Sequence, residues 1–290
     1  MSFNPASAVE LQLLSVDGCP NAGRVRELVQ KALSEAGVQA RLAEPVGDYP
    51  SPTLLVDGID VVTGRPLGSN PACRLDLPTE AQILSSLEAA VRRRTLARIR
   101  HAAFRGLLTT AAPVNAADLA VRADLSMEVV SAGLRELAGA GRVHVTHNDQ
   151  VIGSAGLSVV PSRHELLLGG RLFWTWCAWD AVGILGALRA SGVIRSRDPL
   201  TGAAIAISFT AGLPEPSHVA MFRADDEGYA SIRDEYCPLT NLFHDGQTAE
   251  AWARERGVRG IVAALPEATT AAAQEWSELV AGLAPPGGEA

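Results

Sequence analysis

A cysteine and an aspartic acid stand three residues apart inside an apolar, tryptophan-rich stretch of this 290-residue chain, which runs Arg-Leu-Phe-Trp-Thr-Trp-Cys-Ala-Trp-Asp over residues 171–180. In a helix, residues i and i+3 share a face, so the Cys177 sulfur and the Asp180 carboxyl are expected to point to one place. The three tryptophans of the stretch are expected to exclude water there, and burial raises the pKa of a carboxylic acid. This pairing predicts attack by a soft nucleophile on a soft electrophile, followed by delivery of a proton.

The composition limits the kind of protein in which this cysteine–aspartate pair lies. The chain is long enough for two or three domains, and its hydrophobic fraction of 47% is sufficient for packed cores. A net charge of −7 argues against a general affinity for nucleic acid or for an anionic membrane. The N-terminus lacks a basic segment followed by an apolar one, and Asp180 interrupts the longest apolar run, residues 172–188. We therefore expect a soluble, cytoplasmic protein with no membrane partner.

The four cysteines are spread over the whole chain, at positions 19, 73, 177 and 237. This spacing is unlike a disulfide framework, which is denser and occurs in small secreted domains. In a reducing compartment such thiols are either buried core residues or functional thiolates. For a cysteine considered without its neighbours, the core role is the favoured interpretation. Asp180 is different, because an acid in an apolar run must be hydrogen-bonded, paired or functional.

Residues 1–90 are predicted to form an α/β domain. Alternating and apolar patterns indicate strands and helices in the order βαβββα, with Cys19 at the start of the first helix and Pro52 just before the third strand. This arrangement resembles the thioredoxin and glutaredoxin-like fold, and the resemblance implies that Pro52 follows a cis peptide bond.

Cys19 departs from the redox members of that fold. They carry Cys-x-x-Cys, whereas this loop reads Cys-Pro-Asn-Ala, so two-thiol exchange has no local partner. A helix N-terminus still favours the Cys19 thiolate, which makes it a candidate thiol relay. Cys73 is a distant alternative partner. A domain that only docks another protein is the competing interpretation.

Residues 91–155 are predicted to form three helices and a hairpin, the pattern of a winged helix-turn-helix segment. The candidate recognition helix, residues 126–138, carries Glu128, Arg135 and Glu136 as its only charges, which is a poor set for phosphate contacts. A structural role is therefore favoured over DNA binding, and no nucleic-acid partner is expected.

Residues 156–290 contain the Cys177–Asp180 segment and carry a family resemblance. The matching segments, in order, are residues 172–180, 201–207, 236–243, 248–252 and 257–262. In this order and spacing they resemble the core of organomercurial (alkylmercury) lyases, a family that also carries a winged-helix block before its core. With the thioredoxin-like domain, which is an addition to the usual architecture of that family, the expected chain is α+β overall: a thioredoxin-like domain, a winged helix-turn-helix segment and a mixed α+β alkylmercury-lyase-like core.

The resemblance also implies residue roles and partners. Mercury(II) is soft and prefers thiolates, so Cys177 and Cys237 are expected to bind the mercury of an organomercurial substrate. Asp180 is expected to protonate the departing carbanion as a general acid. No cofactor is implied. Hg(II) is bound as product by the two cysteines and Asp180, and external low-molecular-weight thiols or a mercuric reductase are expected to accept it.

Other functions stay open on the residues alone. Several family members carry a further cysteine, regarded as structural, where this chain has Asp198. The same three site residues are compatible with a protein that binds Hg(II) or Cu(I) without cleaving anything, or with a metal-responsive regulator. A thiol-disulfide enzyme would require a partner for Cys19. Release of arene from an arylmercurial in excess thiol separates a lyase from a metal binder.

Overall fold

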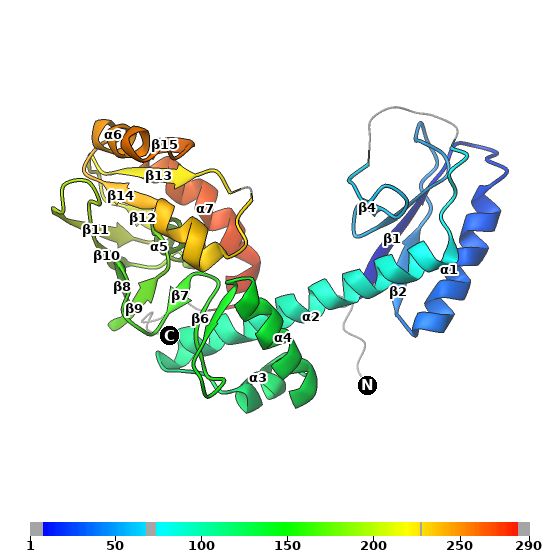
Figure 1. Ribbon diagram of the computed structural model, residues 1–290, viewed down its shortest axis with the longest axis horizontal. Coiled ribbons are helices and arrows are strands. Elements are labelled where there is room, and N and C mark those ends of the chain that lie inside the picture. The colour runs from blue at the N-terminus through cyan, green and yellow to red at the C-terminus, as the bar shows by residue number, and fades with distance from the viewer. Residues whose placement is uncertain (1–7, 68–73, 227, 284–290) are drawn as a thin grey trace. The chain divides into compact units, whose positions relative to one another are not determined.

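A computed structural model describes residues 8–67, 74–226 and 228–283, and the chain divides into two compact units, Met1–Thr95 and Leu96–Ala290 (Figure 1). Cys73 lies outside the described residues. None of the helices within these ranges combines the length and apolar character that a membrane crossing requires.

The first unit is a four-stranded sheet with helices packed on it. Its elements are β1 (Val9–Leu14), α1 (Ala22–Ala36), β2 (Ala40–Ala43), β3 (Thr53–Val56), β4 (Ile59–Asp60) and the first part of α2 (Glu80–Thr110). The strand order is β2-β1-β3-β4, with β1 parallel to β2 and antiparallel to β3. The element order is the predicted one, and the Ser51–Pro52 bond is cis, as expected.

The alternation of buried and exposed residues along β1 explains how the core of the first unit forms. Val9, Leu11 and Leu13 on β1 are buried, while the residues between them are exposed, so one face of the strand meets α1. Val25 and Val29 of α1 complete that contact at helical spacing. The unit has its own apolar cluster, separate from that of the second unit.

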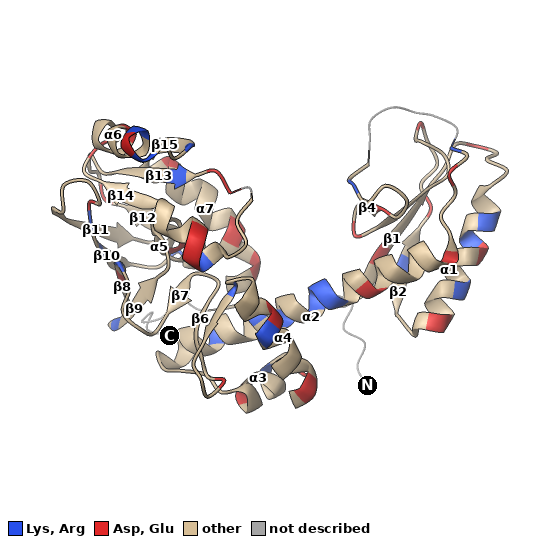
Figure 2. Ribbon diagram, in the orientation of Figure 1, with Lys and Arg blue, Asp and Glu red and all other residues tan. Residues whose placement is uncertain are grey.

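The second unit begins within α2. We expected two helices over residues 79–108, but α2 is one continuous helix, because no glycine or proline interrupts residues 80–105. Two capped helices follow, α3 (Ala116–Ala123) and α4 (Met127–Gly139). Asn115 and Ser126 accept backbone N–H groups at their N-termini. α4 carries both signs of charge (Figure 2).

An eight-stranded antiparallel sheet forms one layer of the second unit, in the order β12-β11-β10-β8-β9-β7-β6-β5. Its strands are β5 (Val143–Val145), β6 (Val151–Ser154), β7 (Leu157–Ser158), β8 (His164–Leu168), β9 (Arg171–Thr175), β10 (Gly192–Arg197), β11 (Ala204–Thr210) and β12 (Leu213–Pro214). The hairpin after α4 thus belongs to the same sheet as the strands around Cys177.

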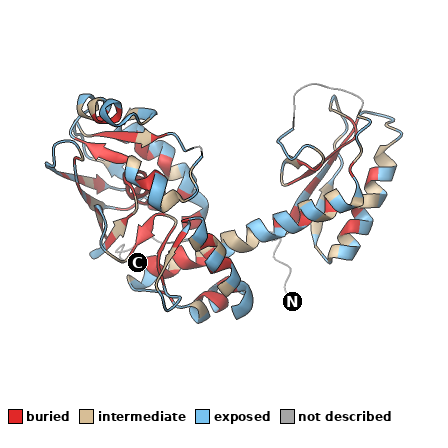
Figure 3. Cartoon of the chain, viewed as in Figure 1, coloured by how far each residue is buried: buried red, intermediate tan, exposed pale blue. Residues whose placement is uncertain are grey.

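A smaller sheet, the eight-stranded sheet and helix α7 (Leu265–Val280) contact the central helix α5 (Ala178–Leu188). The smaller sheet has the order β14-β13-β15, from Asn241–Phe243, Ala220–Ala224 and Gly260–Ala264. α6 (Gly246–Arg256) contacts this sheet, and α7 packs along α5. Residues on all sides of α5 are buried, as its nearly continuous apolar sequence requires (Figure 3).

The structure corrects two expectations about the second unit. The tryptophan-rich stretch is not one helix: residues 171–175 form β9, which pairs with β7 and β8, and the helix begins at Ala178. Aromatic residues suit a strand, and the partner strands decide the outcome. Helix α7 was not predicted, although its buried residues, among them Leu265, Ala268, Ala272, Trp276 and Leu279, recur at helical spacing.

Asp198 is a buried acid in the β10–β11 turn that holds two segments together. Its carboxylate accepts the backbone N–H groups of Leu200, Thr201 and His244, and the His244 ring lies 3.3 Å away. Burial raises its pKa, but the hydrogen bonds outweigh burial and the net pKa is lowered. Asp198 is therefore a structural anchor between the turn and the segment before α6.

We predict that Asp198→Ala lowers the free energy of unfolding by about 2–4 kcal/mol, because buried donors lose a charged acceptor. Urea denaturation followed by tryptophan fluorescence measures it, since all five tryptophans lie in the second unit. A group with a lowered folded pKa contributes stability above its unfolded pKa, so the difference should shrink below pH about 4. Exposed Glu250→Ala is the matched control, and equal effects of the two substitutions would contradict the prediction.

Candidate active site

Three chemically active side chains converge in the second unit. The Cys177 sulfur, an Asp180 carboxylate oxygen and the Cys237 sulfur all lie within 4.8 Å of one another, and all three residues are buried. Cys177 and Asp180 come from the start of α5, whereas Cys237 comes from a segment 57 residues later in the sequence. These are the three predicted catalytic residues, and the fold brings them together.

The start of α5 fixes Cys177 and Asp180. Cys177 is the N-cap residue, and its backbone N–H donates to Asp180 Oδ2 at 2.8 Å. An acidic side chain in the third position of a helix often reaches back to the cap in this way. The Thr175 hydroxyl donates to Cys177 O at 2.9 Å and holds the preceding strand end. The i, i+3 relation holds through a helix cap and not through a continuous helix.

A short backbone link joins the two cysteine segments. The Ala178 N–H donates to Thr240 O at 3.3 Å, and the Thr240 N–H donates to Cys237 O at 3.2 Å. Thr240 is fully buried, and its hydroxyl accepts the Ala224 N–H of β13. The position of Cys237 relative to Cys177 is therefore set by main-chain hydrogen bonds.

Cys237 follows an unusual helical turn. Residues Ile232–Tyr236 form a single π-helical turn that continues directly into the 3-10 turn Cys237–Leu239. Such turns are frequent at functional sites because they redirect side chains. The Ser231 hydroxyl accepts the Asp234 N–H at the start, and the Ile232 N–H donates to Ala140 O after α4. The helical block before the core thus supports the segment that carries Cys237.

The surroundings of the Asp180 carboxyl raise its pKa, so that it holds a proton near neutral pH. Burial raises its pKa to about 7, against hydrogen bonds from the Cys177 side chain and backbone, which lower it. The carboxyl of Glu275, on α7, raises it further. Burial is the largest of these effects, so exclusion of water determines the protonation state.

The two thiols are coupled by a hydrogen bond, and the pKa of each is raised. For Cys177 burial is the largest cause, followed by the bond to Cys237 and the Asp180 carboxyl. For Cys237 the bond from Cys177 is the largest effect and lowers the pKa, but burial and nearby carboxyls outweigh it. Burial therefore favours the neutral thiol form of both cysteines.

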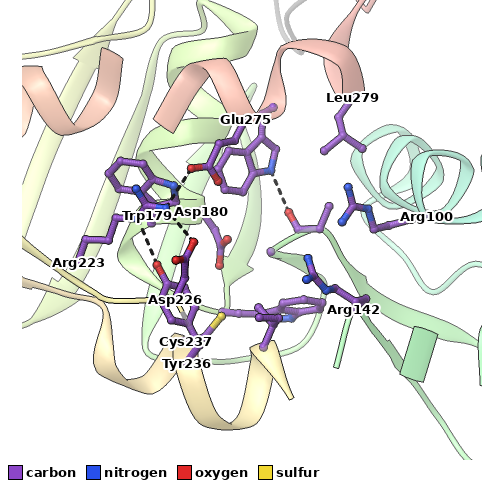
Figure 4. A pocket seen from close by; sticks show the side chains of 15 residues that line it. Arg100, Arg142, Trp179, Asp180, Arg223, Asp226, Tyr236, Cys237, Glu275 and Leu279 are labelled. Carbon is purple, nitrogen blue, oxygen red and sulfur yellow. Dashed lines mark hydrogen bonds and ion pairs between the residues drawn. The ribbon is translucent and has the colours of Figure 1, made fainter. Parts of the chain in front are cut away.

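A pocket opens on this cluster (Figure 4). Asp180 and Cys237 line it, while Cys177 is not among the described residues that do. Trp176 and Trp179 form part of the wall, as expected, but Trp276 of α7 takes the place predicted for Trp174. Trp174 lies on β9, opposite Ser158 and Glu165 in the sheet.

An arginine with two acidic partners forms another wall. The Arg223 guanidinium lies 4.3 Å from the ring centroid of Trp179 and donates to Tyr236 Oη at 3.3 Å. It also pairs with Asp226 at 3.5 Å and Glu275 at 3.4 Å. No sequence pattern predicted these residues, because charged side chains on separate elements form no local motif.

Gly156 permits the close approach of the β6–β7 turn to the acid. It has a φ of +85°, and a Cβ there would lie 2.2 Å from Asp180 Cγ. Its carbonyl accepts the Trp176 N–H at 2.9 Å, so the turn is fixed against the cysteine segment. A glycine at an expected turn was visible in the sequence, but the contact it allows was not.

We predict that Gly156→Ala displaces the Asp180 side chain, because the new methyl group would occupy the position of the carboxyl. Any reaction that uses Asp180 should slow by about ten-fold or more, since a misplaced group loses much of its effect. Single-turnover kinetics on the purified variant measure this.

Gly170→Ala is the matched control, because Gly170 also has a positive φ (+72°) but nothing lies within 4 Å of its Cβ position. It should share the backbone strain and keep the rate. Equal rates for the two variants would show that Gly156 has no special relation to the acid.

Cys19, the predicted relay thiol, lies in the first unit and is partly exposed before α1. A hydrogen bond from the Ser51 hydroxyl lowers its pKa, opposed by slight burial and aided by the backbone N–H groups of Asn21 and Ala22. The first unit therefore contains a thiol whose pKa is lowered, apart from the three-residue cluster.

The part of the chain that contains this site is similar to known proteins. Residues 157–278 match the sequence model of the MerB family, alkylmercury lyase. Alkylmercury lyases of Bacillus cereus and Clostridium butyricum are each 26% identical over 155 residues, covering 51% of this chain and 69% of the relative. A crystal structure of the mercury-bound form of MerB2 aligns with a TM-score of 0.58 and 21% identity, over 65% of this chain and 92% of that one. The matched region contains Cys177, Asp180 and Cys237.

Proposed function

We propose, from the premise that this chain belongs to the alkylmercury lyase family through residues 157–278, that it cleaves the carbon–mercury bond of organomercurials by protonolysis. The observation that carries the proposal is the convergence of two thiols and a proton-holding carboxyl within 4.8 Å beside a pocket. Soft sulfur suits mercury, and a protonated acid suits a departing carbanion.

Cys237 makes the first bond to mercury in this proposal. It lines the pocket whereas Cys177 does not, so it is the sulfur that an incoming substrate reaches. An electron pair of this sulfur forms a sulfur–mercury bond to R–Hg, and the small thiolate that carried the substrate leaves with the Cys237 proton as a thiol.

Cys177 and Asp180 complete the reaction. The Cys177 sulfur forms the second sulfur–mercury bond and gives up its proton, which weakens the carbon–mercury bond. The electron pair of that bond leaves with carbon and takes the Asp180 proton, giving R–H. The proton from Cys177 restores the Asp180 carboxyl, and Hg(II) stays bound to two sulfurs. External thiols then exchange onto mercury and restore the two cysteines, so turnover requires a thiol acceptor.

Binding without cleavage is the second candidate, and the same geometry supports it. Three ligand atoms so close together suit a thiophilic ion such as Hg(II) or Cu(I) whether or not the acid acts. The raised pKa of Asp180 favours cleavage, because a simple metal ligand gains nothing from keeping its proton.

Incubation of the pure protein with an arylmercurial and excess small thiol separates the two candidates. A lyase releases arene over many turnovers, measured by gas chromatography. Stoichiometric uptake of mercury without arene would overturn the proposal and leave a metal binder.

We predict that Asp180→Asn retains mercury binding but slows arene release about a hundred-fold or more, because the amide supplies no acidic proton. In the parent, the single-turnover rate should fall about ten-fold per pH unit above about 7, as the protonated fraction falls. The variant should lose this pH dependence. Near-parent turnover of Asp180→Asn would remove the acid from the mechanism.

We predict that Cys177→Ser and Cys237→Ser each abolish cleavage, since a hydroxyl binds mercury poorly. They should differ in binding: Cys177→Ser still captures one R–Hg group through Cys237, and Cys237→Ser captures far less at the site. Mass spectrometry of the adducts measures this, with Cys73→Ser as a control expected to be nearly silent. Cleavage at the parent rate by Cys237→Ser would exclude the two-sulfur mechanism.

The thiol relay through Cys19 is a further part of the proposal. A tethered thiolate benefits from a high effective concentration, of the order of mM for a short flexible linker. We predict that Cys19→Ser keeps the single-turnover rate, slows multiple turnover when external thiol is limiting, and recovers with excess thiol. Identical rates of variant and parent at limiting thiol would rule the relay out and leave the first unit as a docking domain.

A further inference from the structure

The pocket beside Cys237 has a second pair of arginines that the proposed chemistry does not use. Arg100 comes from α2, and Arg142 lies between α4 and β5. Figure 4 shows their guanidinium groups near each other, across the pocket from Arg223, with Asp180 between. Both residues belong to the second unit and line the same pocket as the acid.

Arg100 and Arg142 lack the acidic ion-pair partners that Arg223 has. Arg223 pairs with Asp226 and Glu275, whereas neither Arg100 nor Arg142 takes part in the ion pairs found among the described residues. Burial lowers the pKa of Arg100, and the charge of Arg142 lowers it further. Two neighbouring cations, one of them largely removed from water, are costly unless an anion joins them.

Buried hydrogen-bond donors without a partner also indicate that a ligand binds in this pocket. The Nε atom of Arg100 is buried and has no hydrogen-bond partner in the described part of the chain, and the same is true of Nε1 of Trp176 and Trp179. All three residues line this pocket. Buried donors in native structures nearly always have an acceptor, so an acceptor supplied by a ligand is expected here.

The charge of the pocket indicates that this ligand is an anion. Of the three arginines that line the pocket, Arg223 is paired with Asp226 and Glu275, which leaves the positive charges of Arg100 and Arg142 for a ligand. A group with one negative charge and a planar pair of acceptor oxygens matches both the charge and the fork of a guanidinium. A carboxylate fits these requirements.

The location relates this anion to the reaction. Arg142 lines the same pocket as Cys237, so its positive charge faces the space in which mercury would reach that sulfur. A carboxylate held by the two arginines therefore belongs to the molecule whose mercury is reaching Cys237.

We infer that Arg100 and Arg142 form a carboxylate-binding subsite that selects organomercurial adducts bearing a carboxylate. The inference deepens the proposed function and rests on it. The carboxylate belongs either to the organic group on mercury or to the small thiol that delivers it, and the subsite chemistry is the same in both cases.

The test compares phenylmercury with 4-carboxyphenylmercury, each delivered as its mercaptoethanol or its mercaptoacetate adduct. In the parent, kcat/KM should be higher for adducts with a carboxylate. Arg100→Gln should reduce this preference about ten-fold or more, because it removes a charged, buried donor. Arg100→Lys should restore part of it, since the charge remains without the fork.

Arg142→Gln tests the subsite independently of Arg100, at an exposed position where the substitution should not impair folding. Arg195→Gln, on the surface of β10, is the control for loss of one positive charge and should keep the parent preference. A preference that follows the aryl carboxylate identifies the organic group as the source, and one that follows mercaptoacetate identifies the thiol.

Affinities of the same adducts are measured in the Asp180→Asn background, where cleavage is not required. Selective binding without arene release in the parent would overturn the proposed function and keep the subsite. Equal kcat/KM and equal affinity for carboxylated and neutral adducts in the parent, or an unchanged preference in both Arg100→Gln and Arg142→Gln, would overturn the subsite.

Discussion

Exclusion of water from the Asp180 carboxyl is the constraint on which the rest of the site depends. A solvated aspartic acid is ionised at neutral pH and has no proton to give. Here burial raises its pKa to about 7, and the Cys177 N–H fixes the orientation of the carboxyl at the start of α5. The surrounding tryptophans, the turn at Gly156 and the neighbouring Glu275 all preserve this state.

Small residues bring the surrounding elements close enough to seal the site. A Cβ at Gly183 would lie 2.4 Å from the ring of Trp276, and one at Gly186 would lie 3.0 Å from Ala273. These glycines let α7 pack directly along α5, although glycine is unfavourable inside a helix by about 1 kcal/mol. The Trp276 Nε1–H donates to Ala155 O at 2.9 Å, so α7 also reaches the turn that contains Gly156. Helix packing and the chemistry of the acid therefore depend on the same contacts.

The sequence predicted the three converging residues, the order of elements in the first unit, the cis bond before Pro52 and the buried state of Asp180. Those features depend on local patterns or on ordered motifs. The sequence did not predict that residues 171–175 form a strand, because that outcome depends on β7 and β8. It did not predict Arg100, Arg142, Arg223 or Glu275 either, since these residues come from four separate segments of the chain and meet only through tertiary packing.

The π-helical turn at Ile232–Tyr236 has a consequence for how sequences of this kind can vary in length. A π turn contains one more residue than an α turn between the same hydrogen-bonded groups. Loss of a single residue between Ser231 and Cys237 would be absorbed if the turn relaxed to α geometry, because both kinds of turn carry the chain about once around the helix axis. The sulfur would then still face Asp180, although the segment would be one residue shorter. This segment can therefore differ in length by one residue without losing the direction of its last side chain.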